Sequence, residues 1–268
     1  MRADSFSSVV RSAIASQRLP SADSGRPLRT GVQGFTVTLV PEETRLSVDE
    51  VVLSLRVWPC RRPAGPVVVL LPGTGATAQD WDGVAARVSE ERPVVAVDLR
   101  GHGRSDWPGR YSIQLFADDV SVALDQLGGG PVDLVGHSLG GLVACKVAAA
   151  RHDLVRRLVL EDVGVPHRRE PDMPARPRGQ LPFDWAMVEQ VRPEIDDPDP
   201  TWPETVAGIQ APTLVVGGGP RSFVPQQHVA ELVDRLRDGR LTTIDVGHLV
   251  HESSPEEFTD RLMAFIRT

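Results

Sequence analysis

The residues of this sequence best suited to chemistry lie around Ser138. This serine is the centre of Gly136-His-Ser-Leu-Gly140, which follows the apolar run 132–135 and precedes the Leu-, Val- and Ala-rich stretch 139–151. A serine held on a tight turn between strand and helix needs neighbours two positions away with almost no side chain, so both are glycine. Such a turn lifts the hydroxyl out of the sheet and predicts a nucleophile. The alternative is an ordinary turn in which the serine caps the helix.

A base for this hydroxyl is predicted at His248. A serine hydroxyl is a weak nucleophile near neutral pH and needs a base within hydrogen-bond distance. His248 follows the last predicted strand after a glycine, which places the imidazole at the same sheet edge as Ser138. His251 is the alternative base. His102 and His137 lie inside the glycine-containing turns and are interpreted as structural.

A metal site is not expected from the histidines. The tract 248–252 holds two histidines and a glutamate, but its order matches neither metalloprotease motif, and no third ligand is suitably spaced. A serine nucleophile with a histidine base needs no cofactor, so we expect none.

The pattern of apolar residues predicts the strands and helices that hold these side chains. Strands over 35–40 and 51–58, joined by a polar turn, predict an antiparallel hairpin. Short apolar strands then alternate with amphipathic helices. The predicted strands are 67–71, 94–97, 132–135, 157–160, 213–216 and 241–245, and the predicted helices are 78–90, 112–127, 139–151, 184–191, 226–237 and 255–266. This alternation predicts an α/β fold with a mostly parallel sheet covered on both faces and ligands outside the carboxyl ends of its strands.

One α/β core with two additions is expected. The core comprises residues 35–162 and 212–268. Residues 1–34 are predicted to be an N-terminal extension, with a short amphipathic helix up to about residue 19 and then a linker. Residues 163–211 contain one convincing helix, capped by Asp184, and are predicted to form a lid. Insertions of this length often cover a site, and the aromatic residues of this one favour packing over disorder.

Composition limits the partners. The chain of 268 residues has a formal net charge of −7 and a pI of about 5.5, which argues against nucleic acid or an anionic membrane surface as the main partner. No apolar run is long enough to span a membrane, and the start lacks a signal pattern, so a cytoplasmic location is expected. The expected partner is a small molecule, and the oligomeric state is left open.

From about residue 35 to its end, the sequence resembles the α/β-hydrolase family. The matching motifs occur in the family's order and are Leu71-Pro-Gly-Thr74, Asp98-Leu-Arg-Gly-His-Gly-Arg-Ser105, Gly136-His-Ser-Leu-Gly140 and Gly247-His248. The resemblance implies a three-layer fold with an eight-stranded sheet, a lid after the sixth strand and a Ser–acid–His triad. It also implies an oxyanion hole formed by the backbone N–H groups of Thr74 and Leu139. The family usually has histidine where this sequence has Pro72, a change that leaves the backbone donors in place.

The acid of this triad departs from the family's usual pattern. Members most often carry it just after the seventh strand, but here no Asp or Glu occurs between Glu204 and Glu231, and Arg221 stands about where the carboxylate is expected. The imidazolium formed in catalysis needs a negative partner. Some members supply it from the end of the sixth strand, and Asp162 falls at the position that they use. We therefore favour Asp162, with Glu161, the last strand residue, as the alternative acid.

These residues predict a serine hydrolase that cleaves a carboxylic ester, lactone or thioester with an apolar portion, through an acyl-enzyme. One alternative is a hydrolase-fold protein that acts non-hydrolytically, as a pathway enzyme or a binding protein, because the usual acid is missing. Another is a dinucleotide-binding domain. Gly73-Thr-Gly-Ala-Thr-Ala78 follows a strand, opens toward a helix and precedes Asp98 at the end of the next strand. That interpretation leaves Ser138 and His248 unexplained.

Overall fold

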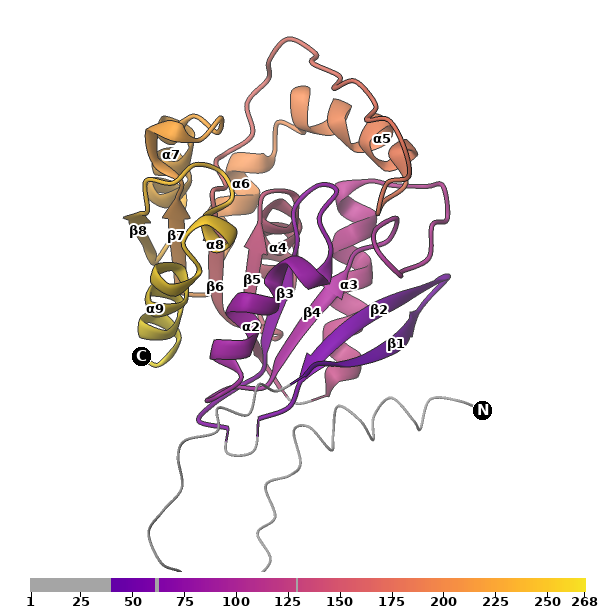
Figure 1. Cartoon of the computed structure of the whole chain (residues 1–268). Helices are drawn as coiled ribbons and strands as arrows, with labels where there is room; N and C mark the ends of the chain where they lie inside the picture. The colour runs from indigo at the N-terminus through magenta and orange to yellow at the C-terminus, as the bar shows by residue number, and fades with distance from the viewer. Residues whose placement is uncertain (1–39, 61–62, 129) are drawn as a thin grey trace, which may run out of the picture.

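An eight-stranded sheet organises the computed structural model, which describes residues 40–60, 63–128 and 130–268 (Figure 1). The strands are β1 (Glu42–Val48), β2 (Val51–Trp58), β3 (Val68–Leu71), β4 (Val94–Asp98), β5 (Val132–His137), β6 (Val155–Glu161), β7 (Thr213–Gly217) and β8 (Gly239–Thr243). Their order across the sheet is β1-β2-β4-β3-β5-β6-β7-β8. From β4 to β8 all neighbours are parallel, and β2 pairs antiparallel with β1 and β4. The mostly parallel eight-stranded sheet expected from the sequence is confirmed.

Helices cover both faces of this sheet, as Figure 1 shows. They are η1 (Ala78–Trp81), α2 (Asp82–Val88), α3 (Ile113–Leu127), α4 (Leu139–Ala150), α5 (Trp185–Asp196), α6 (Trp202–Ala207), η2 (Gly219–Arg221), α7 (Gln226–Arg235), α8 (Val250–Ser253) and α9 (Pro255–Ile266). Along β4, Val95 and Val97 join the core under α3 and α4, and Val94 and Ala96 join the core under α2 and α9. Successive strand residues point to opposite faces, so a strand buried on both sides is apolar throughout.

The N-terminal hairpin differs from the predicted one in its first strand. β1 covers Glu42–Val48, the stretch that was expected to be a polar turn, and it pairs antiparallel with β2. The actual turn is Asp49-Glu50, between Val48 and Val51. β1 is an edge strand whose outer positions stay exposed, so its polar residues concealed the strand in the sequence. Of the predicted strand 35–40, only Val40 lies within the described residues, and it is in no strand; the predicted N-terminal helix and linker lie outside them.

The segment between β6 and β7 runs across the carboxyl ends of the central strands, at the top of Figure 1. Asp184 caps α5 as predicted, with its side chain accepting the Ala186 N–H at 3.1 Å. The helix continues through Pro193 to Asp196, although the sequence predicted an end at 191. Its last turn is stabilised by the contacts of Asp196 with Arg169 and Arg192. The short helix α6 was missed. Its six residues are fixed by burial of Trp202 and Val206, which is tertiary packing that a local pattern does not reveal.

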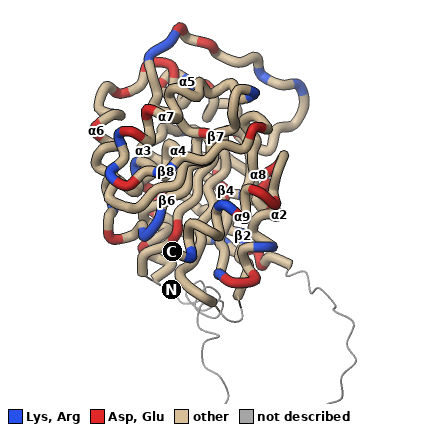
Figure 2. The backbone as a smooth tube through the Cα atoms, turned by 90° about the vertical axis from the view of Figure 1, so that its left-hand side faces the viewer, with Lys and Arg blue, Asp and Glu red and all other residues tan. Residues whose placement is uncertain are grey.

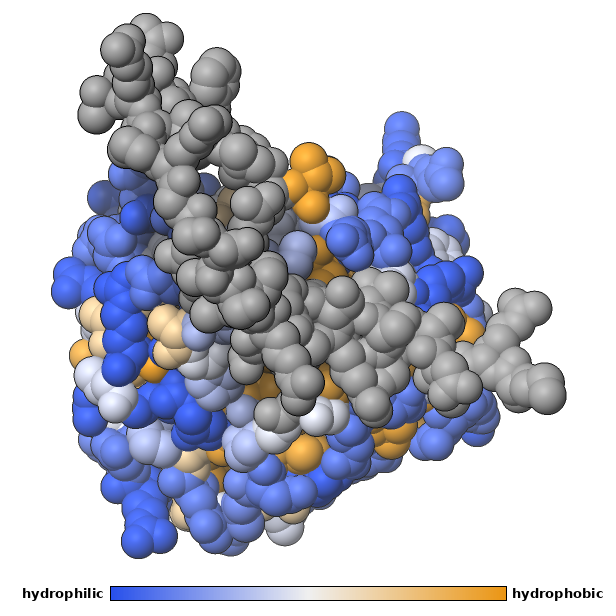
Figure 3. All heavy atoms as spheres, turned by 90° about the horizontal axis from the view of Figure 1, so that it is seen from below, coloured by the Kyte–Doolittle hydropathy of each residue, from blue (hydrophilic) through white to orange (hydrophobic). Residues whose placement is uncertain are grey.

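The outer surface is polar in the remaining views. Figure 2 shows Lys, Arg, Asp and Glu interspersed over the elements in view. In Figure 3, which looks at the molecule from below, hydrophilic residues predominate among the described residues, with small apolar patches between them. None of the helices in the described ranges is long and apolar enough to cross a membrane.

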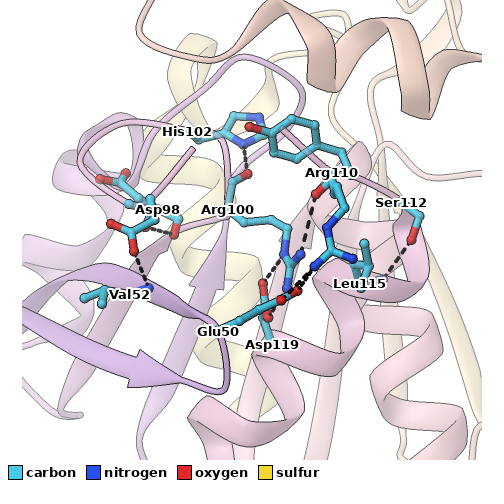
Figure 4. Close-up of polar contacts among 12 residues, drawn as sticks. Glu50, Val52, Asp98, Arg100, His102, Arg110, Ser112, Leu115 and Asp119 are labelled. Atoms are coloured by element: carbon cyan, nitrogen blue, oxygen red, sulfur yellow. Dashed lines mark hydrogen bonds and ion pairs between the residues drawn. The ribbon is translucent and has the colours of Figure 1, made fainter. Parts of the chain in front are cut away.

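The loop after β4 is fixed by a buried ion pair (Figure 4). Arg100 donates to both oxygens of Asp119 on α3, at 2.5 and 2.6 Å, and both side chains are buried. Two residues on, His102 Nδ1 donates to the Arg100 carbonyl at 3.0 Å. The pair therefore anchors the turn that carries His102 to the central helix α3.

Removing one partner of this pair is expected to destabilise the protein strongly, because it leaves a buried charge without a counter-ion. We expect Asp119→Ala to lower the free energy of unfolding by about 3–5 kcal/mol, measured by urea denaturation. Asp118→Ala is the matched control, since Asp118 is exposed on the same helix and should change stability by less than about 0.5 kcal/mol. Equal effects of the two substitutions would contradict this assignment.

Candidate active site

Ser138 lies on a strained turn between β5 and α4. Its φ of 50° and ψ of −117° belong to neither element, and such values are costly for a residue with a side chain. A Cβ at Gly136 would lie 2.4 Å from the Gly140 carbonyl oxygen, and a Cβ at Gly140 would lie 2.5 Å from the Leu71 and Pro72 carbonyl oxygens. Both glycines are therefore required sterically, as their spacing predicted.

Two backbone N–H groups beside Ser138 are without a protein acceptor among the described residues. They are those of Thr74, on the loop after β3, and of Leu139, the first residue of α4. The loop packs on the serine, since a Cβ at Gly73 would lie 3.2 Å from Ser138 Cβ. The next N–H along, that of Gly75, donates instead to His102 Nε2 at 3.2 Å. The N-terminus of a helix together with a neighbouring loop amide is a setting that favours negative charge.

His248 and Asp162 are in direct contact. His248 Nδ1 lies 2.7 Å from Asp162 Oδ2, with the carboxylate buried and the imidazole 14% exposed. Asp162 directly follows β6 and has a φ of 50°. His248 lies on the loop between β8 and α8. Its carbonyl oxygen accepts a hydrogen bond at 3.0 Å from Nε2 of His137, the residue before Ser138. The histidine loop is thereby tied to the turn that holds the serine.

The Asp162 carboxylate is surrounded by donors from the segment after β7, which we call the 218–226 segment. The Gly218 N–H donates to Oδ1 at 2.8 Å, and Gln226 Nε2 lies 3.3 Å from the same oxygen. The Ser222 hydroxyl donates to Oδ2, the oxygen that also contacts His248. Burial acts to raise the pKa of Asp162, but the hydrogen bonds from His248, Ser222 and Gly218 outweigh burial and hold the pKa below its usual 3.8.

A second acid–histidine pair lies directly beside the first. Glu161, at the end of β6, accepts both the backbone N–H and the Nδ1–H of His251 at 2.8 Å, and both side chains are buried. The ring of His251 stacks on Trp81 with centroids 4.0 Å apart. Burial opposes charge on both groups, but their mutual attraction and the hydrogen bonds prevail. The pKa of Glu161 therefore falls below 4.5, and that of His251 rises above 6.5.

The other two central histidines are held neutral. Burial lowers the pKa of His102 and of His137 to about 4. Because His102 Nδ1 donates to a carbonyl, its Nε2 is free to accept the Gly75 N–H and so to orient the loop after β3. Both histidines thus position loops, in agreement with their structural interpretation.

The family to which the chain belongs follows from its match to a family model. A model described as the alpha/beta hydrolase family matches residues 68–261, which is most of the chain. This chain belongs to the alpha/beta hydrolase family. The family resemblance seen in the sequence is confirmed, and it places the chain among hydrolases.

Two named relatives and a solved structure resemble the chain over most of its length. An esterase of Mycobacterium tuberculosis is 31% identical over 252 residues, which cover 76% of this chain and 84% of that protein. An sn-1-specific diacylglycerol lipase of Mus musculus is 25% identical over 248 residues, which cover 75% and 81%. The crystal structure of E-2-(acetamidomethylene)succinate hydrolase has a TM-score of 0.72 at 23% identity, covering 85% of this chain and all of that one. This last likeness concerns the fold alone.

The acids and bases predicted from the sequence form two pairs in the structure. Asp162 lies with His248, whereas the alternative acid Glu161 lies with the alternative base His251. Arg221, which occupies the family's usual acid position, lies 3.6 Å from Asp245. Among the residues that the structure describes, no group of three or more His, Cys, Asp or Glu is arranged to hold a metal ion.

The sequence did not single out the donors in the 218–226 segment. Ser222 and Gln226 carry no motif, and only the fold brings them to Asp162, about sixty positions away. The signal that could have found them is the pattern itself: a loop at the right sheet edge, without acids but with short polar side chains.

The Glu161–His251 pair should give stability a defined pH dependence. Because folding lowers the pKa of Glu161, its ionised carboxylate stabilises the fold above the unfolded pKa of 4.5. This stabilisation is lost as the pH falls through the folded pKa. Because folding raises the pKa of His251, its protonated imidazole stabilises the fold below the unfolded pKa of 6.5. This stabilisation is lost as the pH rises through the folded pKa. We therefore expect Glu161→Gln to destabilise the protein most between these pH values, by about 3–5 kcal/mol in urea unfolding.

Glu256→Gln is the control for this measurement, since Glu256 is exposed on α9. Its effect should be small at every pH. A Glu161→Gln effect that stays constant from pH 5 to pH 9 would show that the charge of His251 has no part in it.

Proposed function

We propose that the chain is a serine hydrolase that cleaves a carboxylic ester, lactone or thioester by a Ser138–His248–Asp162 triad. The observation that carries the proposal is the 2.7 Å contact between His248 Nδ1 and the buried Asp162 carboxylate, on loops that meet the strained Ser138 turn. A donor on Nδ1 leaves Nε2 of a neutral imidazole as the acceptor, which is the tautomer that a general base requires. The similarity to an esterase and a lipase supports acyl transfer as the reaction class.

In the proposed reaction, Ser138 Oγ attacks the substrate carbonyl carbon while His248 Nε2 takes the hydroxyl proton. The negative charge that develops on the carbonyl oxygen is stabilised by the Thr74 and Leu139 N–H groups. His248 then gives its proton to the leaving alcohol or thiol as the bond to the acyl carbon breaks. Water then attacks the acyl carbon while His248 Nε2 takes its proton, and His248 passes a proton to Ser138 Oγ as the bond between the acyl carbon and Oγ breaks, which releases the acid and restores the serine. Asp162 remains ionised throughout and holds the imidazolium.

An apolar group in the substrate is supported by the surface next to His248. The ring centroids of Phe223 and His248 lie 4.1 Å apart, yet Phe223 is 76% exposed. Leu249, the next residue after His248, is 42% exposed. An apolar ligand that covers such side chains removes apolar surface from water, which lowers the free energy and favours binding. The segment 163–211, which crosses this end of the sheet in Figure 1, is proposed as the lid of the site.

Three substitutions test the triad with a panel of nitrophenyl esters and lactones of different chain length. We expect Ser138→Ala to lower kcat by several orders of magnitude, because the nucleophile is lost. Asp162→Asn should lower kcat about 10³- to 10⁴-fold, because the amide cannot hold the imidazolium. Glu161→Gln, assayed at a pH where it is folded, should cost far less.

Circular dichroism serves as the folding control for all three variants. Unchanged activity in Ser138→Ala would refute the mechanism. Near wild-type activity in Asp162→Asn together with loss in Glu161→Gln would transfer the role of the acid to Glu161.

A further inference from the structure

The 218–226 segment occupies the place where this family most often carries its acid, yet its residues donate to a carboxylate instead of supplying one. Asp162 is 1% exposed and ionised, and a buried carboxylate is costly unless hydrogen bonds replace its lost water. Its two oxygens receive four contacts, three of which come from Gly218, Ser222 and Gln226. The anion is therefore held from the neighbouring loop.

Ser222 differs from the other two donors in the oxygen that it contacts. Gly218 and Gln226 contact Oδ1, whereas Ser222 contacts Oδ2, which also receives the His248 contact. The position of the Ser222 hydroxyl thus bears directly on the oxygen that faces the imidazole. Loss of this donor would leave Oδ2 with His248 as its one partner and so would weaken the hold on the orientation of the carboxylate about Cβ–Cγ.

The direction of the Ser222 proton is also fixed. The hydroxyl oxygen accepts the Val224 N–H at 2.9 Å, so one lone pair is occupied. A serine hydroxyl carries a single proton, and the other partner of the Ser222 hydroxyl is the ionised Asp162 carboxylate, which can only accept. In this arrangement the Ser222 hydroxyl is therefore the donor and Asp162 the acceptor.

We propose that Ser222 is a positioning residue of the active site, which holds the Asp162 carboxylate ionised and aimed at His248. The inference rests on the proposed triad and assigns a role to the segment that lacks the family's usual acid. The competing explanation is that Ser222 only shapes its own loop through the Val224 N–H. The two explanations differ in whether the effect of Ser222 depends on the charge of Asp162.

The test compares Ser222→Ala, Ser222→Thr and Ser222→Val in the full chain, using the best ester found for the wild type. Thr and Val have the same shape and differ in the hydroxyl group. We expect Ala and Val to lower kcat/KM by about 10- to 100-fold, as for loss of a hydrogen bond to a charged group, and Thr to restore most of the activity. Arg221→Ala, on the exposed neighbour, should leave kcat/KM within about twofold.

A double-mutant cycle separates positioning from loop shape. In the Asp162→Asn background, Ser222→Ala should cost less than about threefold, since the charge through which Ser222 acts is gone. A loss equal to that in the wild type would overturn the proposal and assign Ser222 to the loop alone. Full activity in Ser222→Val would overturn it as well.

A second readout needs no substrate. The proton NMR resonance of His248 Nδ1–H, which lies at low field in a histidine–carboxylate contact, should move in Ser222→Ala and stay in Arg221→Ala. An unmoved resonance in Ser222→Ala would refute the positioning role. If the wild type hydrolyses none of the esters and thioesters while Ser222→Ala still moves the resonance, the proposed function fails but the hold of Ser222 on Asp162 stands.

Discussion

A carboxylate buried at the end of β6 must be matched by donors, and the site is built around this requirement. Asp162 lies just beyond the end of β6 and is 1% exposed, so its charge is maintained by hydrogen bonds from His248, Ser222 and Gly218. These donors come from the loops after β7 and β8, and the Gly247 N–H in turn donates to the Gly218 carbonyl at 2.9 Å. Three consecutive strand ends are therefore held together by one anion.

The consecutive acids Glu161 and Asp162 illustrate how backbone geometry separates two roles. Glu161 is the last residue of β6 and points toward Trp81 and α8, where it holds His251. Asp162 has left the strand with a positive φ and points toward the 218–226 segment and His248. In our account the first pair fixes the helix that follows His248, and the second pair activates the serine. Each histidine thus has its own carboxylate, although the acids are adjacent in sequence.

Much of this arrangement could be predicted from local sequence patterns. The parallel strands are continuous apolar runs, and the Ser138 turn has its two glycines, so these strands and the turn between β5 and α4 were placed correctly. The first strand could not be placed, because an edge strand with polar outer positions resembles a turn. Helix α6 and the donor Ser222 were also missed, since both depend on contacts between residues that are distant in the chain. The choice of Asp162 over Glu161 came from the family resemblance, and the contact of Asp162 with His248 supports it.

The proposed mechanism requires that Ser138 is acylated during turnover. The most direct measurement is mass spectrometry of the protein quenched in acid while it hydrolyses a nitrophenyl ester, followed by mapping of the modified peptide. We expect an added acyl mass on Ser138 that disappears as the ester is consumed. Ester turnover without an adduct at Ser138, or with the acyl group on another residue, would contradict it.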